Sequence, residues 1–321
     1  MTFDLTTILK VIAMAVVQGI AEFLPISSSG HLLVMGRFFE LPEVFTLSIL
    51  LHFGTLLSVL VYFAKDIGHV LRHSPRTVGL VIVGTIPTVI IGFAILHYAK
   101  FLEESLLATG FFFWITAILL LTLMKRYGQR TEHEIYYEEV AANLGDDDLD
   151  IPETKTMEST TFMDAIIVGI SQGIAALPGL SRSGTTISVA LSRHFSRDWA
   201  AEFSFFLSIP VIAGGAILEI IKLVKESESG SALAAFTQDP SMAVYAIGAI
   251  VSFVVGLLAL SSLMRLLKAG RLHYFAYWLL LIGTACVIWT TTEHWDQIVD
   301  IWNNNATLRS LTSIFNAGGA E

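Results

Sequence analysis

The sequence predicts an all-α, polytopic integral membrane protein with six transmembrane helices plus two re-entrant helix pairs in an inverted-topology repeat. Its 321 residues are 54% hydrophobic and only 15% charged, and the mean hydropathy is +0.68. Soluble domains carry about a quarter charged residues, so this chain has too few polar side chains to cover a water-soluble globule. The net charge of −9 argues against a nucleic-acid partner, because binding phosphates requires a basic face. The single cysteine, Cys286, excludes an intramolecular disulfide.

Six apolar runs approach the length of a transmembrane helix, which needs about 20 residues to cross a hydrocarbon core of roughly 30 Å. They are 44–64, 78–96, 106–124, 203–218, 242–264 and 274–292. Two further apolar stretches, 5–24 and 162–177, run into the polar clusters PISSSGH and PGLSRSGTT. We expect these broken stretches to be re-entrant rather than spanning. His52 lies inside the first run and is interpreted as a hydrogen-bonded packing residue.

The distribution of basic residues predicts the orientation of the spans, because cytoplasmic loops are enriched in Lys and Arg. Three connections are rich in them and are expected to be cytoplasmic: Lys65, Arg72 and Arg76; Lys125, Arg126 and Arg130; and Arg265, Lys268 and Arg271. Each half then holds one broken segment and three spans, in opposite topology. The predicted organisation is a first repeat at 1–124, an acidic cytoplasmic loop at 125–161, a second repeat at 162–292 and a C-terminal tail at 293–321.

The two broken segments are related in sequence. QGIAEFLPISSSGH at 18–31 aligns without gaps with QGIAALPGLSRSGT at 172–185, and seven of the fourteen positions are identical. Inverted repeats in membrane proteins place a binding site near the bilayer midplane, where broken helices of both halves meet and point their N-termini at an anion. The alignment therefore locates the expected site at the two polar clusters.

The residues of these clusters suit phosphate chemistry. The serines fall near a helix N-cap, where free N–H groups bind anions, and Arg182 offers a planar fork that matches phosphate oxygens. Glu22 could act as a general base or hold a divalent cation, and His31 could carry a proton or attack as a nucleophile. Ser28 is the natural hydroxyl nucleophile, three residues before His31. A structural ion pair of Glu22 with Arg182 is the alternative.

At these residues the sequence resembles the bacitracin-resistance (BacA) family of undecaprenyl pyrophosphate phosphatases. That family carries the motif (E/Q)xxxE followed by PxSSSGH, here 18–22 and 25–31, and the motif PGxSRSxxT, here 178–186. Both motifs match in full, and the resemblance extends over residues 5–292. One position departs from many members, because Gln18 stands where a second carboxylate often lies.

The resemblance implies a membrane phosphatase that removes the terminal phosphate of undecaprenyl pyrophosphate, recycles the lipid carrier for cell-wall synthesis and confers bacitracin resistance. It implies catalytic roles for Glu22, Ser28, His31 and Arg182, with Ser28, His31 or water as the nucleophile, and a divalent cation, magnesium or calcium, at Glu22. The implied substrate-binding residues are Ser27, Ser29, Gly30, Ser181, Ser183, Gly184 and Thr185.

The implied location is the inner membrane of a bacterium, with the site open to the periplasm. The expected partners are a polyprenyl diphosphate lipid and membrane lipids, and a homodimer is an open alternative. A secondary transporter or flippase for an anionic lipid or small anion is the competing function, because it uses the same inverted repeat and helix N-termini.

Overall fold

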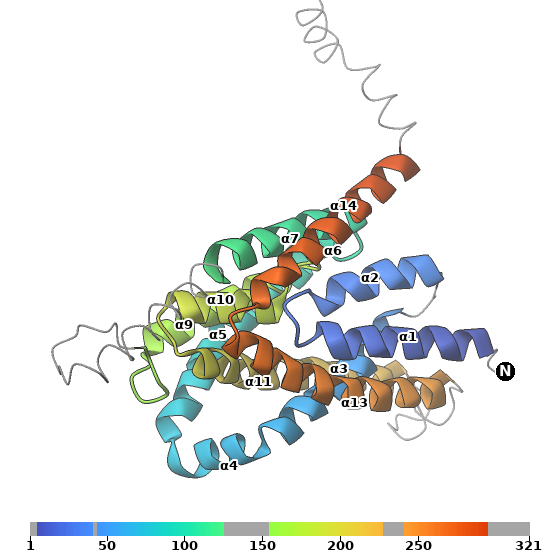
Figure 1. Ribbon diagram of the computed structural model, residues 1–321. Helices are drawn as coiled ribbons and strands as arrows, with labels where there is room; N and C mark the ends of the chain where they lie inside the picture. Colours follow the sequence, from blue (N-terminus) through green and yellow to red (C-terminus); the bar gives the residue numbers. More distant parts are fainter. Residues whose placement is uncertain (1–4, 41–43, 125–153, 227–240, 295–321) are drawn as a thin grey trace, which may run out of the picture.

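The computed structural model describes residues 5–40, 44–124, 154–226 and 241–294 (Figure 1). These residues form helices joined by turns, and among them the only β pairing is an isolated bridge between Lys155 and Phe195. The predicted all-α class is confirmed. The predicted acidic loop at 125–161 lies outside the described residues up to residue 153, and the predicted tail at 293–321 lies outside them from residue 295.

The helices fall into two series, one for each half of the chain. The first series is α1 (Leu5–Ala21), α2 (Ser28–Phe39), α3 (Val44–Tyr62), α4 (Ala64–His73), α5 (Pro75–Tyr98), α6 (Lys100–Glu103), α7 (Leu106–Leu119) and the π-helix η1 (Leu120–Met124). The second series is α9 (Phe162–Ile174), α10 (Arg182–Ser192), α11 (Arg197–Glu226), α13 (Ser241–Lys268), the 3₁₀ turn η2 (Leu272–Tyr274) and α14 (Phe275–Glu293).

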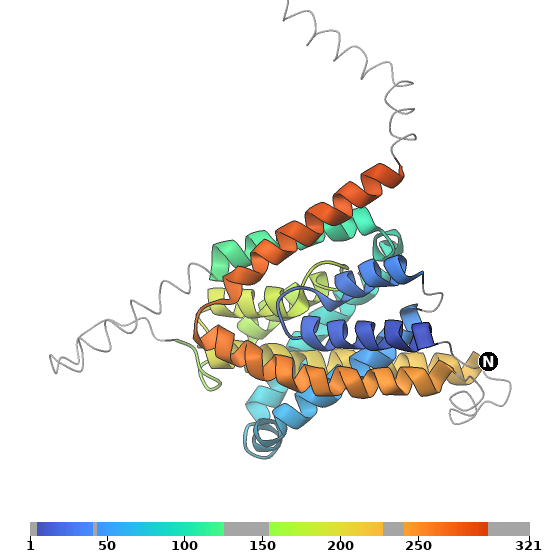
Figure 2. The same cartoon turned by 45° about the vertical axis from the view of Figure 1, so that its right-hand side comes forward.

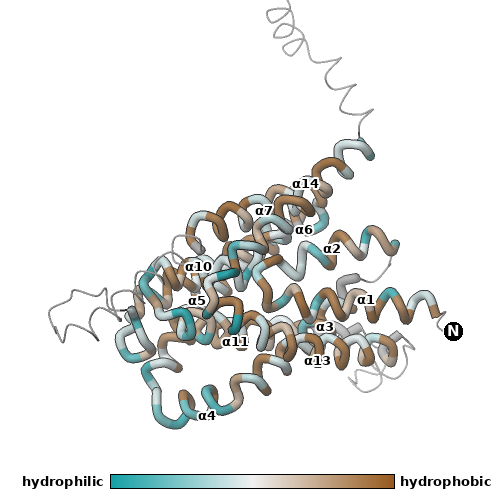
Figure 3. Tube along the Cα trace, in the orientation of Figure 1, coloured by the Kyte–Doolittle hydropathy of each residue, from teal (hydrophilic) through white to brown (hydrophobic). Residues whose placement is uncertain are grey.

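The long helices are apolar enough to cross a membrane, as Figure 3 shows by their predominantly hydrophobic colouring. Within the described part of the chain there are five such helices, or six when the bent pair α3 and α4 counts as one span. α1 and α9 are apolar but shorter, as expected for re-entrant segments. The count agrees with the six predicted spans and makes the chain a multi-pass membrane protein.

The connection between the first two predicted spans differs from expectation. Residues expected to form a loop make the helix α4, which turns away from α3 by 68°. Its apolar side chains Ile67, Val70 and Leu71 recur at helical spacing and line an apolar groove, so the helix is stabilised by its packing side. The expectation of a loop rested on the basic residues Lys65 and Arg72, which α4 carries without interrupting that apolar side.

The helices of the two halves pack in an exchanged pattern (Figures 1 and 2). α5 packs along α9, and α13 packs along α1. α7 packs against α14, and α3 packs against α11. Since α1 corresponds to α9 in the alignment, exchanging the halves maps the first pair onto the second and maps each of the other two pairs onto itself. A two-fold relation between the halves produces this pattern.

Small and hydroxyl side chains allow these close helix contacts, as is common where helices pack within a membrane. Thr88 on α5 donates a hydrogen bond of 2.8 Å to the carbonyl of Gly169 on α9. Ser58 on α3 donates one of the same length to the carbonyl of Phe253 on α13. Gly110 of α7 meets Gly283 of α14 so closely that a Cβ on either would lie 2.8 Å from the other's carbonyl oxygen.

Candidate active site

The two polar clusters form the turns that join the helices of the two re-entrant pairs, α1 with α2 and α9 with α10. In the first turn, Ser27 is the N-cap of α2 and its hydroxyl accepts a hydrogen bond from the amide of Gly30. Its φ of 68° is uncommon for a residue with a side chain, and such backbone strain clusters at functional sites. In the second turn, Gly179 takes the positive φ, 94°, and Ser181 caps α10 through the amide of Gly184.

The two turns contact each other. A Cβ on Gly30 would lie 2.9 Å from Cα of Gly179, and a Cβ on Gly184 would lie 3.1 Å from Cβ of Pro25. These two contacts are equivalent, because residues 25 and 30 align with 179 and 184. The hydroxyl of Ser183 also donates to the carbonyl of Leu24. The N-termini of α2 and α10 therefore lie at one place, as the repeat predicted.

The carboxylate of Glu22 lies at the centre of this place and is buried. Its Oε2 accepts hydrogen bonds from the Ser28 hydroxyl, at 2.6 Å, and from the Gln18 side-chain amide, at 3.1 Å. Its Oε1 pairs with Nη2 of Arg182, which comes from the other half of the chain. The structure thus brings together three of the four predicted catalytic residues, Glu22, Ser28 and Arg182.

In the first turn of α10, two buried donors have no hydrogen-bond partner among the described residues. One is Nη1 of Arg182, the second arm of the guanidinium, and the other is the Thr185 hydroxyl one turn along α10. Buried polar groups in native proteins are nearly always hydrogen-bonded. A phosphate oxygen is a suitable acceptor for both, because charge-assisted bonds from Arg to phosphate are among the strongest in proteins.

His31, the fourth predicted catalytic residue, has different partners. Its Nδ1 lies 2.8 Å from the carbonyl of Ser27, and its Nε2 accepts a hydrogen bond of 2.9 Å from the indole of Trp278 on α14. Its ring also makes an edge-to-face contact with the ring of Phe113 on α7. None of these partners belongs to the Glu22 cluster, so His31 forms a second, aromatic cluster one turn further along α2.

The predicted substrate-binding serines form one similar pair in each turn. The hydroxyls of Ser27 and Ser29 are 3.4 Å apart, and those of Ser181 and Ser183 are also 3.4 Å apart. Ser27 and Ser181 use their oxygens to cap the helices at Gly30 and Gly184. Their capping role is therefore observed, and a role for any of them in binding substrate stays a prediction.

His52 is a neighbour of the site that the sequence did not indicate. Its Nδ1 lies 2.7 Å from the carbonyl of Ser48, and its Nε2 lies 3.5 Å from Oε2 of Glu22. The expected hydrogen bonding of His52 is confirmed by its contact with Ser48, and α3 also carries its ring to the buried carboxylate. The available signal was an ionisable side chain inside an apolar run, which is costly in a membrane and by default functional.

The donor set for a divalent cation is small. Among the described residues no group of three or more His, Cys, Asp or Glu side chains comes close enough to hold a metal. Beside Glu22, however, the amide oxygen of Gln18 is buried without a partner. Magnesium commonly binds through one or two carboxylates together with substrate phosphates. One carboxylate and one amide oxygen fit such a site, provided that the substrate supplies further oxygens.

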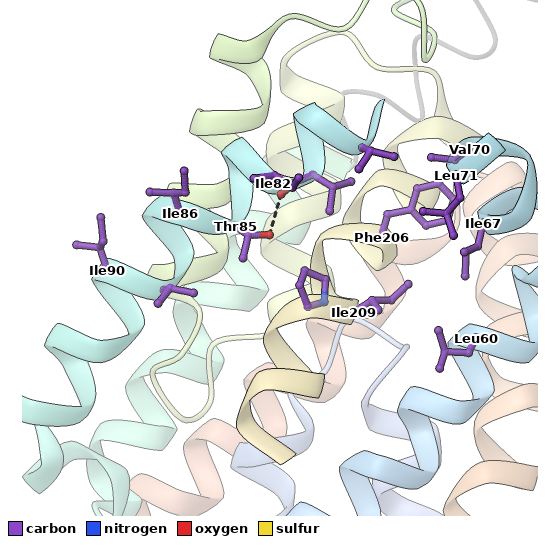
Figure 4. A pocket seen from close by; sticks show the side chains of 14 residues that line it. Leu60, Ile67, Val70, Leu71, Ile82, Thr85, Ile86, Ile90, Phe206 and Ile209 are labelled. Atoms are coloured by element: carbon purple, nitrogen blue, oxygen red, sulfur yellow. Dashed lines mark hydrogen bonds between the residues drawn. The ribbon is translucent and has the colours of Figure 1, made fainter. Parts of the chain in front are cut away.

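A separate groove of about 630 Å³ lies between α3, α4, α5 and α11 (Figure 4). Its lining side chains are apolar except for Thr85, whose hydroxyl donates a hydrogen bond to the carbonyl of Val81. One lining residue, Phe206, is next in the chain to Phe205, whose ring lies under the Arg182 guanidinium. The groove therefore suits a hydrocarbon chain and has no group that could bind a phosphate.

Together, the fold and the site define a multi-pass helical membrane protein with an internal Glu–Ser–Arg cluster between two facing re-entrant turns. Residues 11–285 match the family described as bacitracin resistance protein BacA, and the chain belongs to that family.

Individual relatives match over nearly their whole length. A protein of Rhodopirellula baltica named undecaprenyl-diphosphatase is 38% identical over 88% of this chain and 97% of its own. Proteins of the same name from Treponema denticola and Carboxydothermus hydrogenoformans are 35% and 34% identical and are covered to 97% and 96%. The family expected from the two motifs is confirmed.

Proposed function

We propose that this protein is an undecaprenyl-diphosphatase, which hydrolyses undecaprenyl pyrophosphate to undecaprenyl phosphate and inorganic phosphate. The observation that carries the proposal is the hydrogen bond of 2.6 Å from the Ser28 hydroxyl to Glu22, with the unpartnered Nη1 of Arg182 beside it. A nucleophile, its base and a guanidinium that can bind phosphate are thus held together. The name shared by the relatives agrees with this chemistry.

Ser28 is the nucleophile in this mechanism, and Glu22 is its base. Glu22 takes the hydroxyl proton as Oγ attacks the terminal phosphorus. The bond from that phosphorus to the bridging oxygen breaks, and undecaprenyl phosphate leaves with the bridging oxygen. Water then hydrolyses the phosphoserine, which releases inorganic phosphate and restores the hydroxyl. The contact between Ser28 and Glu22 favours attack by Ser28 over attack by His31, because both ring nitrogens of His31 already have hydrogen-bond partners.

Arg182 and the helix N-termini stabilise the charge that develops on the transferred phosphoryl group. Nη2 of Arg182 is held by Glu22, so the guanidinium is fixed before substrate binds, and Nη1 is left to donate to a phosphate oxygen. Positive ends of the dipoles of α2 and α10 meet at the same place. Such preorganised donors account for much of the catalysis of phosphoryl transfer.

A divalent cation, magnesium or calcium, is a further part of the proposal. Glu22 and the free amide oxygen of Gln18 would hold it together with oxygens of the diphosphate. When bound, it would neutralise charge on the two phosphates. Because Gln18 is uncharged, we expect weak cation binding in the absence of substrate.

The setting of the reaction follows the charge distribution. We propose an inner-membrane enzyme whose site opens to the periplasm, since the connections rich in Lys and Arg are expected on the cytoplasmic side. The prenyl tail lies along apolar helix surfaces, and the groove beside Phe206 supports this part of the proposal. The homodimer stays a prediction, which light scattering on the detergent-solubilised protein tests.

The test is release of inorganic phosphate from undecaprenyl pyrophosphate by the purified full-length protein in detergent, without any gradient. We expect steady turnover that chelation with EDTA lowers and that added magnesium or calcium restores. No phosphate release, combined with movement of the labelled lipid or of phosphate across proteoliposomes, would instead indicate a transporter. Turnover unaffected by EDTA would remove the cation from the proposal and leave the phosphatase.

A further inference from the structure

His31 is enclosed by aromatic side chains from two other helices. The indole of Trp278 on α14 lies nearly parallel to the imidazole, with 6.0 Å between ring centroids and an interplanar angle of 16°. Phe113 on α7 meets the imidazole edge-on, at 5.2 Å and 67°. α7 and α14 pack tightly against each other, so one rigid helix pair holds both rings against α2.

The two hydrogen bonds of the imidazole determine where its proton lies. The carbonyl of Ser27 can only accept, so Nδ1, 2.8 Å away, carries the proton. The indole N–H of Trp278 can only donate, so Nε2, 2.9 Å away, offers its lone pair. His31 is therefore neutral and protonated on Nδ1, and neither nitrogen is free in this state.

We infer that Trp278 is a positioning residue for the reaction, which fixes the tautomer of His31 and keeps its Nε2 as a hydrogen-bond acceptor. Without the indole N–H, the proton could move to Nε2, and the imidazole would lose its bond to Ser27. That bond ties His31 to the residue that caps α2 and carries the strained backbone next to Ser28. Trp278 thus supports the geometry of the nucleophile from the far half of the chain.

The same contact covers Nε2. In the resting site His31 is neither a free base nor a nucleophile, and its Nε2 becomes available only when the indole moves. Trp278 is 46% exposed, although it is bonded to a buried histidine. Its indole therefore forms an outer wall of the aromatic cluster, where it shields the imidazole.

This inference rests on the proposed function for its kinetic consequence, but the tautomer itself can be measured without turnover. The experiment is ¹⁵N NMR of the full-length protein labelled on histidine ring nitrogens, in nanodiscs at neutral pH. The signals of His31 are those that disappear in a His31→Gln variant. We expect a protonated Nδ1 and a bare, hydrogen-bonded Nε2 in the wild type, and a mixture of both tautomers in Trp278→Phe.

The kinetic arm uses three tryptophan variants. Trp278→Phe keeps a ring but loses the donor, and we expect kcat to fall about tenfold with an unchanged KM, as for loss of one hydrogen bond. Trp278→Tyr offers a hydroxyl donor and should recover part of that loss. Trp289→Phe is the matched control, because Trp289 lies on the same helix and donates to the exposed Glu293.

The outcomes separate the two hypotheses. A single, unchanged His31 tautomer in Trp278→Phe overturns the inference, and so does an unchanged kcat in a variant whose tautomers are mixed. Absence of phosphate release by the wild-type protein would overturn the proposed function, while the NMR result would still decide whether Trp278 sets the tautomer.

Discussion

The Ser28 hydroxyl donates a hydrogen bond of 2.6 Å to Oε2 of Glu22, across the turn that breaks the first re-entrant pair. This bond pairs the proposed nucleophile with the carboxylate that lies at the centre of the site. It exists because the helix α1 ends at Ala21 and the chain reverses at Pro25 and Ser27, so that two residues six positions apart face each other. An unbroken helix would have separated them.

Removing the hydroxyl should abolish most activity. We expect Ser28→Ala to lower phosphate release at least a hundredfold, since Ser28 supplies the attacking oxygen. Measurement of kcat in detergent checks this, with Ser262→Ala as a control, because the exposed Ser262 hydroxyl donates only to the carbonyl of Leu258 in its own helix. Near-normal turnover of Ser28→Ala would show that water or another group attacks.

Loss of the Arg182 guanidinium should lower kcat about as strongly as loss of the Ser28 hydroxyl. Arg182→Ala removes both the partner of Glu22 and the free Nη1, and we expect a loss of about a hundredfold or more in kcat, typical of a preorganised charge stabiliser. Arg182→Lys keeps the charge but not the fork, so it should recover only a small part of the activity. Turnover close to wild type in the alanine variant would contradict the placement of the phosphate.

His52 should act through Glu22. We expect His52→Ala to lower kcat about tenfold, because it removes one polar contact of the buried carboxylate. His52→Gln keeps a polar N–H group of similar size and should retain most of the activity. His97→Ala serves as the control, since His97 is exposed near the end of α5. Equal activities of His52→Ala and His52→Gln would contradict a polar role of His52 beside Glu22.

The buried carboxylate of Asp164 should matter for stability rather than for turnover. It accepts hydrogen bonds from Lys155, at 2.7 Å, and from Arg193, at 2.8 Å, and closes the open end of the α9–α10 pair. Lys155 and Arg193 are partly exposed and can turn to water, so the loss of stability should be smaller than the about 3–5 kcal/mol for breaking a fully buried ion pair. We expect Asp164→Asn to lower the Tm of the solubilised protein clearly, whereas Glu158→Gln, at an exposed position, should not.

The pH dependence of that stabilisation has a definite sign. Burial alone would raise the pKa of Asp164, but hydrogen bonds from Lys155, Thr161 and Arg193 hold the pKa well below its usual range. A carboxyl with a lowered folded pKa stabilises the protein above its unfolded value, about 4, and loses this contribution as the pH falls further. The Tm difference between wild type and Asp164→Asn should therefore stay constant from pH 6 to pH 8. A Tm difference that shrinks as the pH falls from 8 to 6 would contradict a lowered pKa of Asp164.

Much of the fold could be predicted from the sequence. The lengths of the apolar runs indicate the spans, because a membrane requires about 20 apolar residues to be crossed. The two interrupted runs, and their alignment over residues 18–31 and 172–185, indicate where the halves meet. α4 was missed, since a short amphipathic helix rich in basic residues resembles a charged loop when only charge is considered.

The two re-entrant pairs are equivalent in structure at positions where their residue types differ. Lys10 on α1 donates to the carbonyl of Phe39 at the end of α2, at 2.8 Å. Asp164 and Arg193, the aligned positions in the second half, close their pair with an ion pair. The positions are equivalent, but the chemistry has diverged, so alignment of residue types does not detect the relation.

By itself, the sequence determined the membrane class and the two broken segments, because these depend on composition and on local patterns, and it indicated the candidate residues Glu22, Ser28, His31 and Arg182. Only the tertiary structure decided which of them meet. Arg182 reaches Glu22 from 160 residues away, and Trp278 reaches His31 from 247 residues away. Such pairings depend on how the two halves pack, and local spacing carries no information about that packing.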